Sequence, residues 1–167
     1  MLNINLDKIT DLDFKTKEAY KTLRTNVQFC GNDVKIISLT SCVPNEGKSM
    51  VSFNLAISMA ETGKKVLFID ADLRKSVLIG RYKINKAIKG LTQYLSGVEQ
   101  LDDVRYSTNV KNMDLILSGP VPPNPAELLN NEKFTELLET ARKEYDYVII
   151  DTPPMSQAAD AEELVDL

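Results

Sequence analysis

Four short runs of β-branched and other apolar residues alternate along the chain with longer segments in which apolar residues recur at helical spacing. The runs cover residues 35–40, 65–70, 112–118 and 146–151. Short runs with few polar positions are typical of parallel strands that are buried on both faces of a sheet. The pattern therefore predicts four buried strands.

Two amphipathic helices are predicted between these strands. Residues 48–61 form the first and are followed by Gly63, a common helix terminator, and residues 131–143 form the second. The apolar face of the second helix carries Phe134, Leu137, Leu138 and Ala141. Because strand and helix alternate, we expect an α/β fold of three layers, with a mostly parallel central sheet, helices on both faces and right-handed crossovers.

Two further segments accompany this core pattern. Residues 14–29 form a predicted helix before the first strand. Its apolar face carries Leu23 and Val27, and its polar face carries Glu18, Lys21 and Arg24. In the proline-rich segment 119–128, Asn124 suits an N-cap and Pro125 suits the first helical position, so a rigid loop is expected to lead into a helix.

The composition fits one globular domain over residues 1–167. Its 24 acidic and 20 basic residues leave a formal net charge of −4, so no nucleic-acid partner is expected. With two cysteines and no histidine, an ordinary zinc site lacks ligands, and both thiols are expected to be reduced. The first residues do not resemble a secretory signal, and no apolar run approaches the ~20 residues that span a bilayer. The chain is therefore expected to be cytoplasmic, or attached to a membrane through something else.

The first predicted strand leads directly into a loop at residues 41–49. Its sequence, Ser-Cys-Val-Pro-Asn-Glu-Gly-Lys-Ser, fits the phosphate-binding pattern G-x-x-x-x-G-K-[ST] except that Cys42 replaces the first glycine. In such a loop, backbone N–H groups bind phosphates, the lysine supplies a mobile cation and the last hydroxyl binds magnesium. The predicted nucleotide-binding residues are Cys42, Val43, Pro44, Asn45, Glu46, Gly47, Lys48, Ser49 and Met50.

Aspartates stand where two of the predicted strands end. Asp70 and Asp72 close the second strand and would point to the same side if the strand continued through them, and Asp151 closes the fourth. Like charges this close are tolerated best beside a cation, so Ser49, Asp70 and Asp151 form a predicted magnesium site. An aspartate that only caps the following turn is the competing interpretation. Arg74 either contacts a phosphate or pairs with Asp72, and the sequence leaves both alternatives open.

These motifs together resemble bacterial tyrosine kinases of the capsule and exopolysaccharide type. The similar segments are the loop 41–49, Asp70-x-Asp72-x-Arg74, Asp151-Thr-Pro-Pro and the loop 119–128. The resemblance extends in order from about residue 15 to residue 163. It implies a P-loop NTPase fold and an ATP-dependent protein-tyrosine kinase or autokinase that regulates capsular or exopolysaccharide synthesis and export.

By this resemblance, the catalytic residues are Lys48, Asp70, Asp72 and Asp151. Lys48 and the loop amides hold the β- and γ-phosphates of ATP, and Ser49 and Asp151 position Mg²⁺. Asp70 with Asp72 completes the metal site and receives the tyrosyl proton, with Asp70 as the first choice of base and Asp72 as the second. Positioning and charge neutralisation supply most of the acceleration in phosphoryl transfer, so a protein without histidine can perform it.

The predicted helix at 14–29 resembles the family's Glu-x-x-Arg-x-x-Arg helix, which builds a ring of subunits. The corresponding residues are Glu18, Lys21 and Arg24, and a lysine lacks the bidentate fork of arginine. An ordinary surface helix in which Glu18 pairs with Lys21 is the competing interpretation. Family members also need the cytoplasmic tail of a membrane-embedded activator, a polysaccharide co-polymerase, so the resemblance implies a protein at the inner face of the cell membrane that acts on protein tyrosines.

Two departures from the family concern the C-terminal side. The terminal tyrosine cluster of the family is absent, and little sequence remains after the fourth strand to complete a wide sheet, so the chain is expected to be a fragment. A sheet that ended at its fourth strand would expose an edge and an apolar face.

Two other functions compete with the kinase. A switch-type partitioning or division-site ATPase has similar motifs, but Ser41 and Cys42 stand where its additional lysine and glycine would be. A non-catalytic, nucleotide-dependent regulator of polysaccharide export is compatible with the absent tyrosine cluster. Transfer of labelled phosphate to tyrosine separates a kinase from both.

Overall fold

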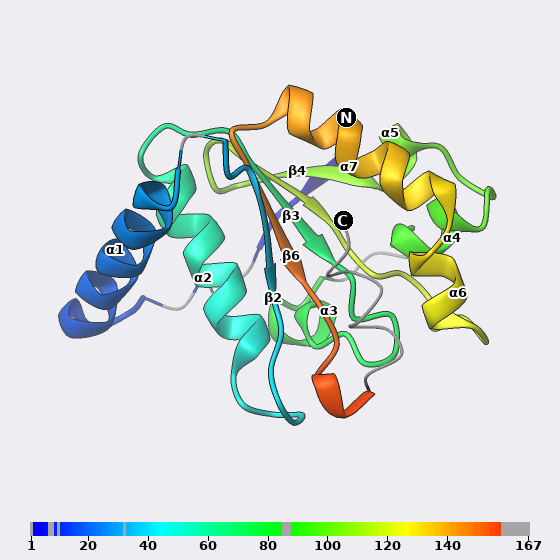
Figure 1. The fold of residues 1–167 in the computed structure, drawn as a ribbon, viewed down its shortest axis with the longest axis horizontal. Coiled ribbons are helices and arrows are strands. Elements are labelled where there is room, and N and C mark those ends of the chain that lie inside the picture. Colours follow the sequence, from blue (N-terminus) through cyan, green and yellow to red (C-terminus); the bar gives the residue numbers. More distant parts are fainter. Residues whose placement is uncertain (1, 7–8, 10, 32, 85–87, 158–167) are drawn as a thin grey trace.

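A six-stranded β-sheet forms the centre of the computed structural model, and helices cover both of its faces (Figure 1). The structure describes residues 2–6, 9, 11–31, 33–84 and 88–157. The strands are β1 (Leu2–Ile4), β2 (Ile36–Leu39), β3 (Val66–Asp70), β4 (Arg105–Thr108), β5 (Met113–Ile116) and β6 (Tyr147–Asp151). Their order is β1-β4-β5-β3-β6-β2, and every pair is parallel except β4 with β5.

The four predicted strands correspond to β2, β3, β5 and β6 and are confirmed, each within two residues of its expected ends. Strands β1 and β4 were not predicted. β4 has the sequence Arg-Tyr-Ser-Thr, and most positions of both strands are only partly buried or exposed, so neither has the apolar run by which the others were found. They form because β4 pairs antiparallel with β5 and then offers its other side to β1.

The last strand of the chain is not the last strand of the sheet. β6 lies between β3 and β2, so the expectation of an uncovered edge at the fourth predicted strand was wrong. The edges of the described sheet are β1 and β2. β2 carries no fully buried residue, unlike β3, in which all five residues are buried.

Helices divide between the two faces and confirm the three layers. One face carries α1 (Phe14–Phe29), α2 (Lys48–Ala60) and α3 (Leu78–Arg81), and the other carries α4 (Leu91–Leu95), α5 (Leu101–Val104), α6 (Pro125–Leu129) and α7 (Glu132–Glu144). Successive residues of β3 point to opposite faces. Val66 and Phe68 therefore belong to the core beneath α2, whereas Leu67 and Ile69 belong to the core beneath α7.

The predicted helix boundaries hold with small shifts. Gly63 follows α2 in the left-handed region, with φ 84°. Asn131 is the N-cap of α7 rather than its first residue, and its side chain accepts from the Phe134 N–H at 3.2 Å. Asn124 precedes α6 as expected, but its amide donates to the Glu127 carboxylate at 2.8 Å and does not cap the backbone.

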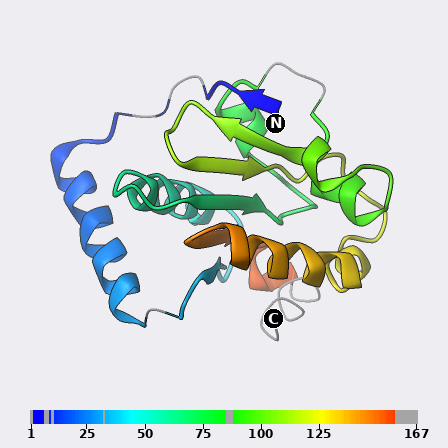
Figure 2. The same cartoon turned by 90° about the horizontal axis from the view of Figure 1, so that it is seen from above.

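Helix α1 lies beside α2 at the periphery of the molecule (Figures 1 and 2). Leu23 and Val27 pack against the core as predicted, yet no residue of α1 is fully buried, and Phe14 and Phe29 at its two ends are 79% and 84% exposed. Within the described residues, no helix has both the length and the apolar character that a bilayer crossing requires. After β6 the described chain ends in a single 3₁₀ turn, η1 (Met155–Gln157), and residues 158–167 lie outside the described residues.

Candidate active site

The loop between β2 and α2 turns through two left-handed residues. Asn45 has φ 67° and Gly47 has φ 85°, a region that glycine enters freely and asparagine more readily than most residues. Gly47 is also the N-cap of α2, and its carbonyl accepts from the Met50 and Val51 N–H groups at 3.0 Å. The first N–H groups of a helix have no partner within it, so the loop and the start of α2 form an anion-binding arrangement.

The Glu46 side chain stabilises this loop from within. Its carboxylate accepts from the N–H groups of Cys42 and Val43 at 3.0 and 3.3 Å. Both donors lie near the beginning of the loop and Glu46 lies near its end, so the two hydrogen bonds hold the two parts of the loop together. Glu46 was predicted as a nucleotide-binding residue from its position alone, and these contacts give it a role in holding the loop shape.

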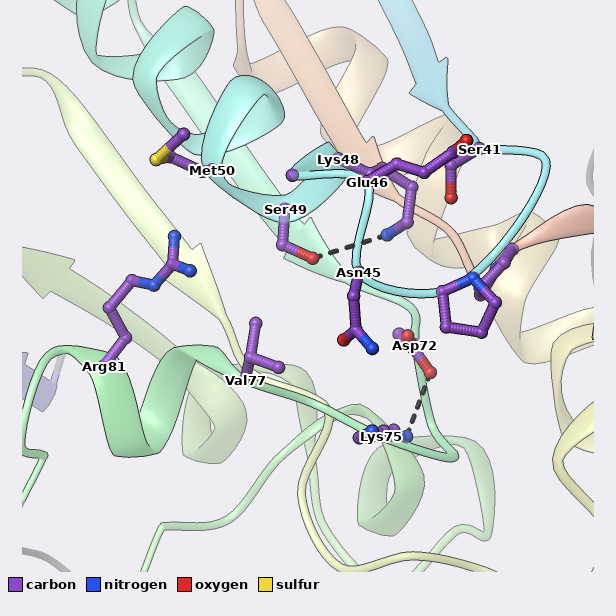
Figure 3. Close-up of a pocket in the computed structure, with 13 residues that line it drawn as sticks. Ser41, Asn45, Glu46, Lys48, Ser49, Met50, Asp72, Lys75, Val77 and Arg81 are labelled. Carbon is purple, nitrogen blue, oxygen red and sulfur yellow. Dashed lines mark hydrogen bonds between the residues drawn. The ribbon is translucent and has the colours of Figure 1, made fainter.

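Lys48 and Asp151 form a buried ion pair beneath the loop. Lys48 Nζ lies 2.6 Å from Asp151 Oδ1, and the two side chains are 7% and 1% exposed. Lys48 Nζ also lies 3.4 Å from Ser49 Oγ (Figure 3). The predicted phosphate-binding lysine, magnesium-binding serine and strand-end aspartate are therefore brought together.

The second oxygen of Asp151 bears on metal binding. Asp151 Oδ1 accepts from Lys48 and from Ser52 Oγ, the latter at 3.1 Å, whereas the buried Oδ2 has no hydrogen-bond partner among the described residues. A buried polar atom without a partner is uncommon and costly. A carboxylate oxygen is also a preferred ligand of Mg²⁺, so Asp151 fits a magnesium site.

Asp70 lies next to Asp151 on the neighbouring strand. The two residues are opposite partners in the pairing of β3 with β6, and each is 1% exposed. Burial raises the pKa of Asp70 to about 7, an effect that the hydrogen bond from Ser76 opposes and that the charges of Asp151 and Asp72 reinforce. Ser76 Oγ lies 2.5 Å from Asp70 Oδ2.

Asp72 follows β3 in a tight turn. β3 ends at Asp70, so the strand does not continue through both aspartates as the sequence allowed. The Asp72 N–H instead donates to Asp70 Oδ1 at 3.2 Å, and Asp72 Oδ1 accepts from the Lys75 N–H at 3.0 Å. Each carboxylate thus caps part of the turn, which was the competing interpretation, while Asp70 still lies beside Asp151, the partner of Lys48.

A pocket of about 220 Å³ opens between the phosphate-binding loop and the segment that follows β3 (Figure 3). Its lining residues are Ser41, Pro44, Asn45, Glu46, Gly47, Lys48, Ser49, Met50, Asp72, Lys75, Val77, Arg81 and Pro154. Seven of the nine predicted nucleotide-binding residues line this pocket, and Cys42 and Val43 do not. Asp70 and Asp151 are not among the lining residues.

The carboxylates do not form a metal-binding cluster by themselves. Among the described residues, no group of three histidine, cysteine, aspartate or glutamate side chains is arranged to hold a metal ion. A magnesium ion with one or two carboxylate ligands, a serine hydroxyl, phosphate oxygens and water does not need such a cluster. The donor set of Ser49 with Asp70 and Asp151 is compatible with that kind of site.

Two serines of the site were not predicted. Ser52 lies one helical turn after Ser49 and donates to Asp151 Oδ1, and Ser76 donates to Asp70. A buried serine on the strand-facing side of a helix is a signal that could have indicated Ser52. Ser76 reaches Asp70 only because of the turn after β3, and no sequence pattern indicates that turn.

The predicted oligomerisation residues lie on α1, on the side of the molecule that carries α2. Lys21 Nζ pairs with Glu18 Oε1 at 2.7 Å, one turn away on the exposed surface. Arg24 Nη1 donates to the carbonyl of Ser58 at 2.7 Å and so links α1 to α2. The Glu18–Lys21 pair is the contact of the competing interpretation, and the ring itself stays a prediction.

Comparison with known proteins gives consistent matches. A family model described as an AAA domain matches residues 34–165. The tyrosine-protein kinase CpsD of Streptococcus agalactiae is 48% identical over 147 residues, which are 88% of this chain and 64% of that protein. The tyrosine-protein kinase YwqD of Bacillus subtilis is 41% identical over 160 residues, 95% of this chain and 67% of that protein. The chain thus spans about two thirds of the length of these relatives.

Solved structures agree with the sequence matches. The kinase domain of the Escherichia coli tyrosine kinase ETK has a TM-score of 0.87 and 37% identity, and the match covers 98% of this chain and 65% of that one. The septum site-determining protein MinD from Pyrococcus horikoshii, complexed with Mg-ADP, has a TM-score of 0.66 and 27% identity over 79% of this chain and 54% of that one. The similarity is therefore greater to the tyrosine kinase than to this division-site protein.

Proposed function

Because the chain belongs to the bacterial tyrosine kinase family, we propose that it transfers the γ-phosphoryl group of ATP to tyrosyl hydroxyls of proteins. The observation that carries this proposal is the buried contact of 2.6 Å between Lys48 and Asp151 beneath the phosphate-binding loop, with Asp70 on the adjacent strand. This arrangement places a candidate phosphate-binding cation (Lys48), a candidate metal ligand (Asp151) and a candidate base (Asp70) in one site.

Binding of ATP uses the loop and Lys48. The backbone N–H groups at the start of α2 bind the phosphates, and Lys48 moves its ammonium group from Asp151 toward the β- and γ-phosphates. Asp151 is then released from its ion pair and is free to act as a ligand. The exchange leaves no buried charge without a partner, because each group passes to an opposite charge.

Magnesium, when bound, neutralises charge on the terminal phosphates. The Ser49 hydroxyl and the Asp151 carboxylate, joined by Asp70, would hold it. Asp151 Oδ2, which has no hydrogen-bond partner in the described part of the chain, supports this assignment.

Asp70 receives the proton of the attacking tyrosyl hydroxyl, with Asp72 as the second candidate. Asp72 lines the pocket, whereas Asp70 is buried behind it and bonded to Ser76. The acceptor hydroxyl must lie within reach of both the terminal phosphate and a carboxylate at the end of β3. We therefore expect the tyrosine to enter from the side of the pocket that residues 72–81 form.

The proposal extends to the partners and the location of the protein. We propose that the cytoplasmic tail of a membrane-embedded activator of polysaccharide export stimulates the kinase, that α1 contributes to a ring of subunits, and that the protein works at the inner face of the cell membrane. The sequence similarity to capsule-type kinases supports these points.

The proposal is tested with γ-labelled ATP, Mg²⁺, a tyrosine-bearing protein and the activator tail, followed by phosphoamino-acid analysis. We expect phosphotyrosine that is lost in Lys48→Met. Asp70→Asn should retain ATP affinity within a few-fold while losing transfer, because the substitution keeps the shape of the site. Tight ATP binding without labelled tyrosine would instead favour the switch-type ATPase or the non-catalytic regulator.

A further inference from the structure

Two exposed cations line the wall of the pocket that faces the phosphate-binding loop. Lys75 and Arg81 both lie on the segment that follows Asp72 (Figure 3). Within the part of the chain that the structure describes, neither side chain has an acidic partner at salt-bridge distance. By contrast, Lys48 is paired with Asp151, and the Glu46 carboxylate accepts from the loop N–H groups.

Exposed apolar side chains accompany these cations. Met50, at the start of α2, is 44% exposed, and Val77, between Lys75 and Arg81, is 37% exposed. Both line the same pocket. A methionine sulfur and a branched aliphatic side chain are suited to pack against an aromatic ring. The pocket therefore offers apolar contacts to a tyrosine ring, and the cations Lys75 and Arg81 precede and follow Val77 in the same segment.

We propose that the pocket recognises tyrosines flanked by acidic residues, with the acceptor ring against Met50 and Val77 and the acidic flanks beside Lys75 and Arg81. This inference rests on the proposed kinase function and names its substrate class. Asp72 lines the same wall, but it is only 8% exposed and its Oδ1 already accepts from the Lys75 N–H. The exposed charges of the wall are therefore those of Lys75 and Arg81, which favour acidic peptides and disfavour basic ones. In the proposed function the loop amides and Lys48 bind the phosphates, which leaves Lys75 and Arg81 for the acceptor.

The test separates docking from chemistry. Two labelled peptides carry a central tyrosine with either two glutamates or two lysines on each side, and fluorescence anisotropy measures their binding in the presence of Mg²⁺ and a non-hydrolysable ATP analogue. We expect the glutamate peptide to bind roughly tenfold more tightly, as two solvent-exposed ion pairs allow. The preference should shrink as salt is raised.

The double variant Lys75→Glu/Arg81→Glu should reverse the preference. Lys64→Glu/Lys111→Glu is the matched control, because it changes the net charge equally at two exposed lysines that precede β3 and β5, at the opposite end of the sheet. This control should keep the preference for the glutamate peptide.

Several results would overturn the inference: equal binding of both peptides, an equal shift in the control, or weaker binding of the ATP analogue in Lys75→Glu/Arg81→Glu with an unchanged peptide ratio. The last would assign the two cations to the nucleotide.

Phosphorylation assays with hydrolysable ATP separate the two proposals. Tight binding of the glutamate peptide without phosphotyrosine would support the docking surface and contradict the kinase. Equal phosphorylation of both peptides would support the kinase and contradict the docking surface.

Discussion

The Glu46 carboxylate is the acceptor on which the loop shape depends, through its bonds to the Cys42 and Val43 N–H groups. In Glu46→Ala, these donors turn to water and the loop samples other conformations. We expect the dissociation constant of ATP to rise about fivefold to tenfold, because the loop must be ordered when the nucleotide binds. Isothermal titration calorimetry measures this change.

Glu46→Gln is the matched control, because its amide keeps one oxygen as acceptor. It should bind ATP with an affinity between those of the wild type and Glu46→Ala. Wild-type affinity in both variants would show that the loop holds its shape without this side chain.

Burial of Asp70 predicts an unusual pH dependence of stability. Its pKa rises from 3.8 to about 7 in the folded chain, so between these values the folded state keeps a proton that the unfolded state has lost. The free energy of unfolding in metal-free buffer should therefore decrease as pH rises from about 4 to 7, by an amount on the order of 4 kcal/mol from this group. Urea unfolding at several pH values measures it.

Asp70→Asn should remove this decrease, because asparagine does not titrate. At pH 8 the variant should be more stable than the wild type in the absence of magnesium, and at pH 4 the two should be similar. An identical decline in both proteins would mean that the Asp70 carboxyl is not the responsible group.

At the scale of single residues, the sequence was informative for residues whose distance from a strand end indicates their chemical role. That Lys48, Ser49 and Asp151 come together could be predicted, because each stands at a set distance from the end of a strand; their roles stay predictions. Ser76 could not, because its bond to Asp70 depends on the turn that the chain makes after β3. The ion pair of Lys48 with Asp151 joins residues 103 positions apart, and only the adjacency of β2 and β6 brings them together.

Among the elements, the start of α4 depends on a close contact between two backbone segments. A Cβ atom on Gly90 would lie 2.3 Å from Gly119 N and 2.4 Å from the Leu117 carbonyl oxygen. Backbone atoms cannot give way as a flexible side chain can, so we expect Gly90→Ala to lower the free energy of unfolding by about 3 kcal/mol or more. Chemical denaturation measures the difference.

Gly80→Ala is the control for this substitution. Gly80 lies in α3, where an added Cβ would meet no atom within 4 Å, and alanine is the better helix former by up to about 1 kcal/mol. Its stability should be unchanged or slightly increased. Equal losses in the two variants would contradict the close-contact explanation.

The same elements show what hydrophobic patterns can predict. β3 was found because it is a short, continuous apolar run, and α7 was found because its buried positions follow the period of a helix. β1 and β4 were missed because their pairing with β5, rather than their own composition, makes them strands. The order of the strands could not be predicted from the sequence either, because nothing in residues 146–151 indicates that β6 lies between β3 and β2.

At the scale of the whole molecule, α1 is the helix through which we propose that subunits meet. It lies at the periphery without a fully buried residue, and Arg24 links it to the Ser58 carbonyl of α2. We expect Arg24→Ala to reduce the mass measured by light scattering, because α1 loses both its anchor and a charged contact. An unchanged mass would leave α1 as an ordinary surface helix.

A lower mass in Arg24→Ala would also be expected if the substitution only loosened α1 from α2 within one subunit. A substitution that strengthens assembly is therefore the sharper test. Lys21 is exposed and pairs only with Glu18 of the same helix among the described residues. Lys21→Arg keeps the charge and adds the planar fork that binds a carboxylate through two hydrogen bonds. If α1 joins subunits, the variant should form the larger species at a protein concentration several-fold lower than the wild type needs. Identical assembly curves would show that position 21 faces solvent in every state of the protein, because a surface ion pair within one helix gains little from either cation.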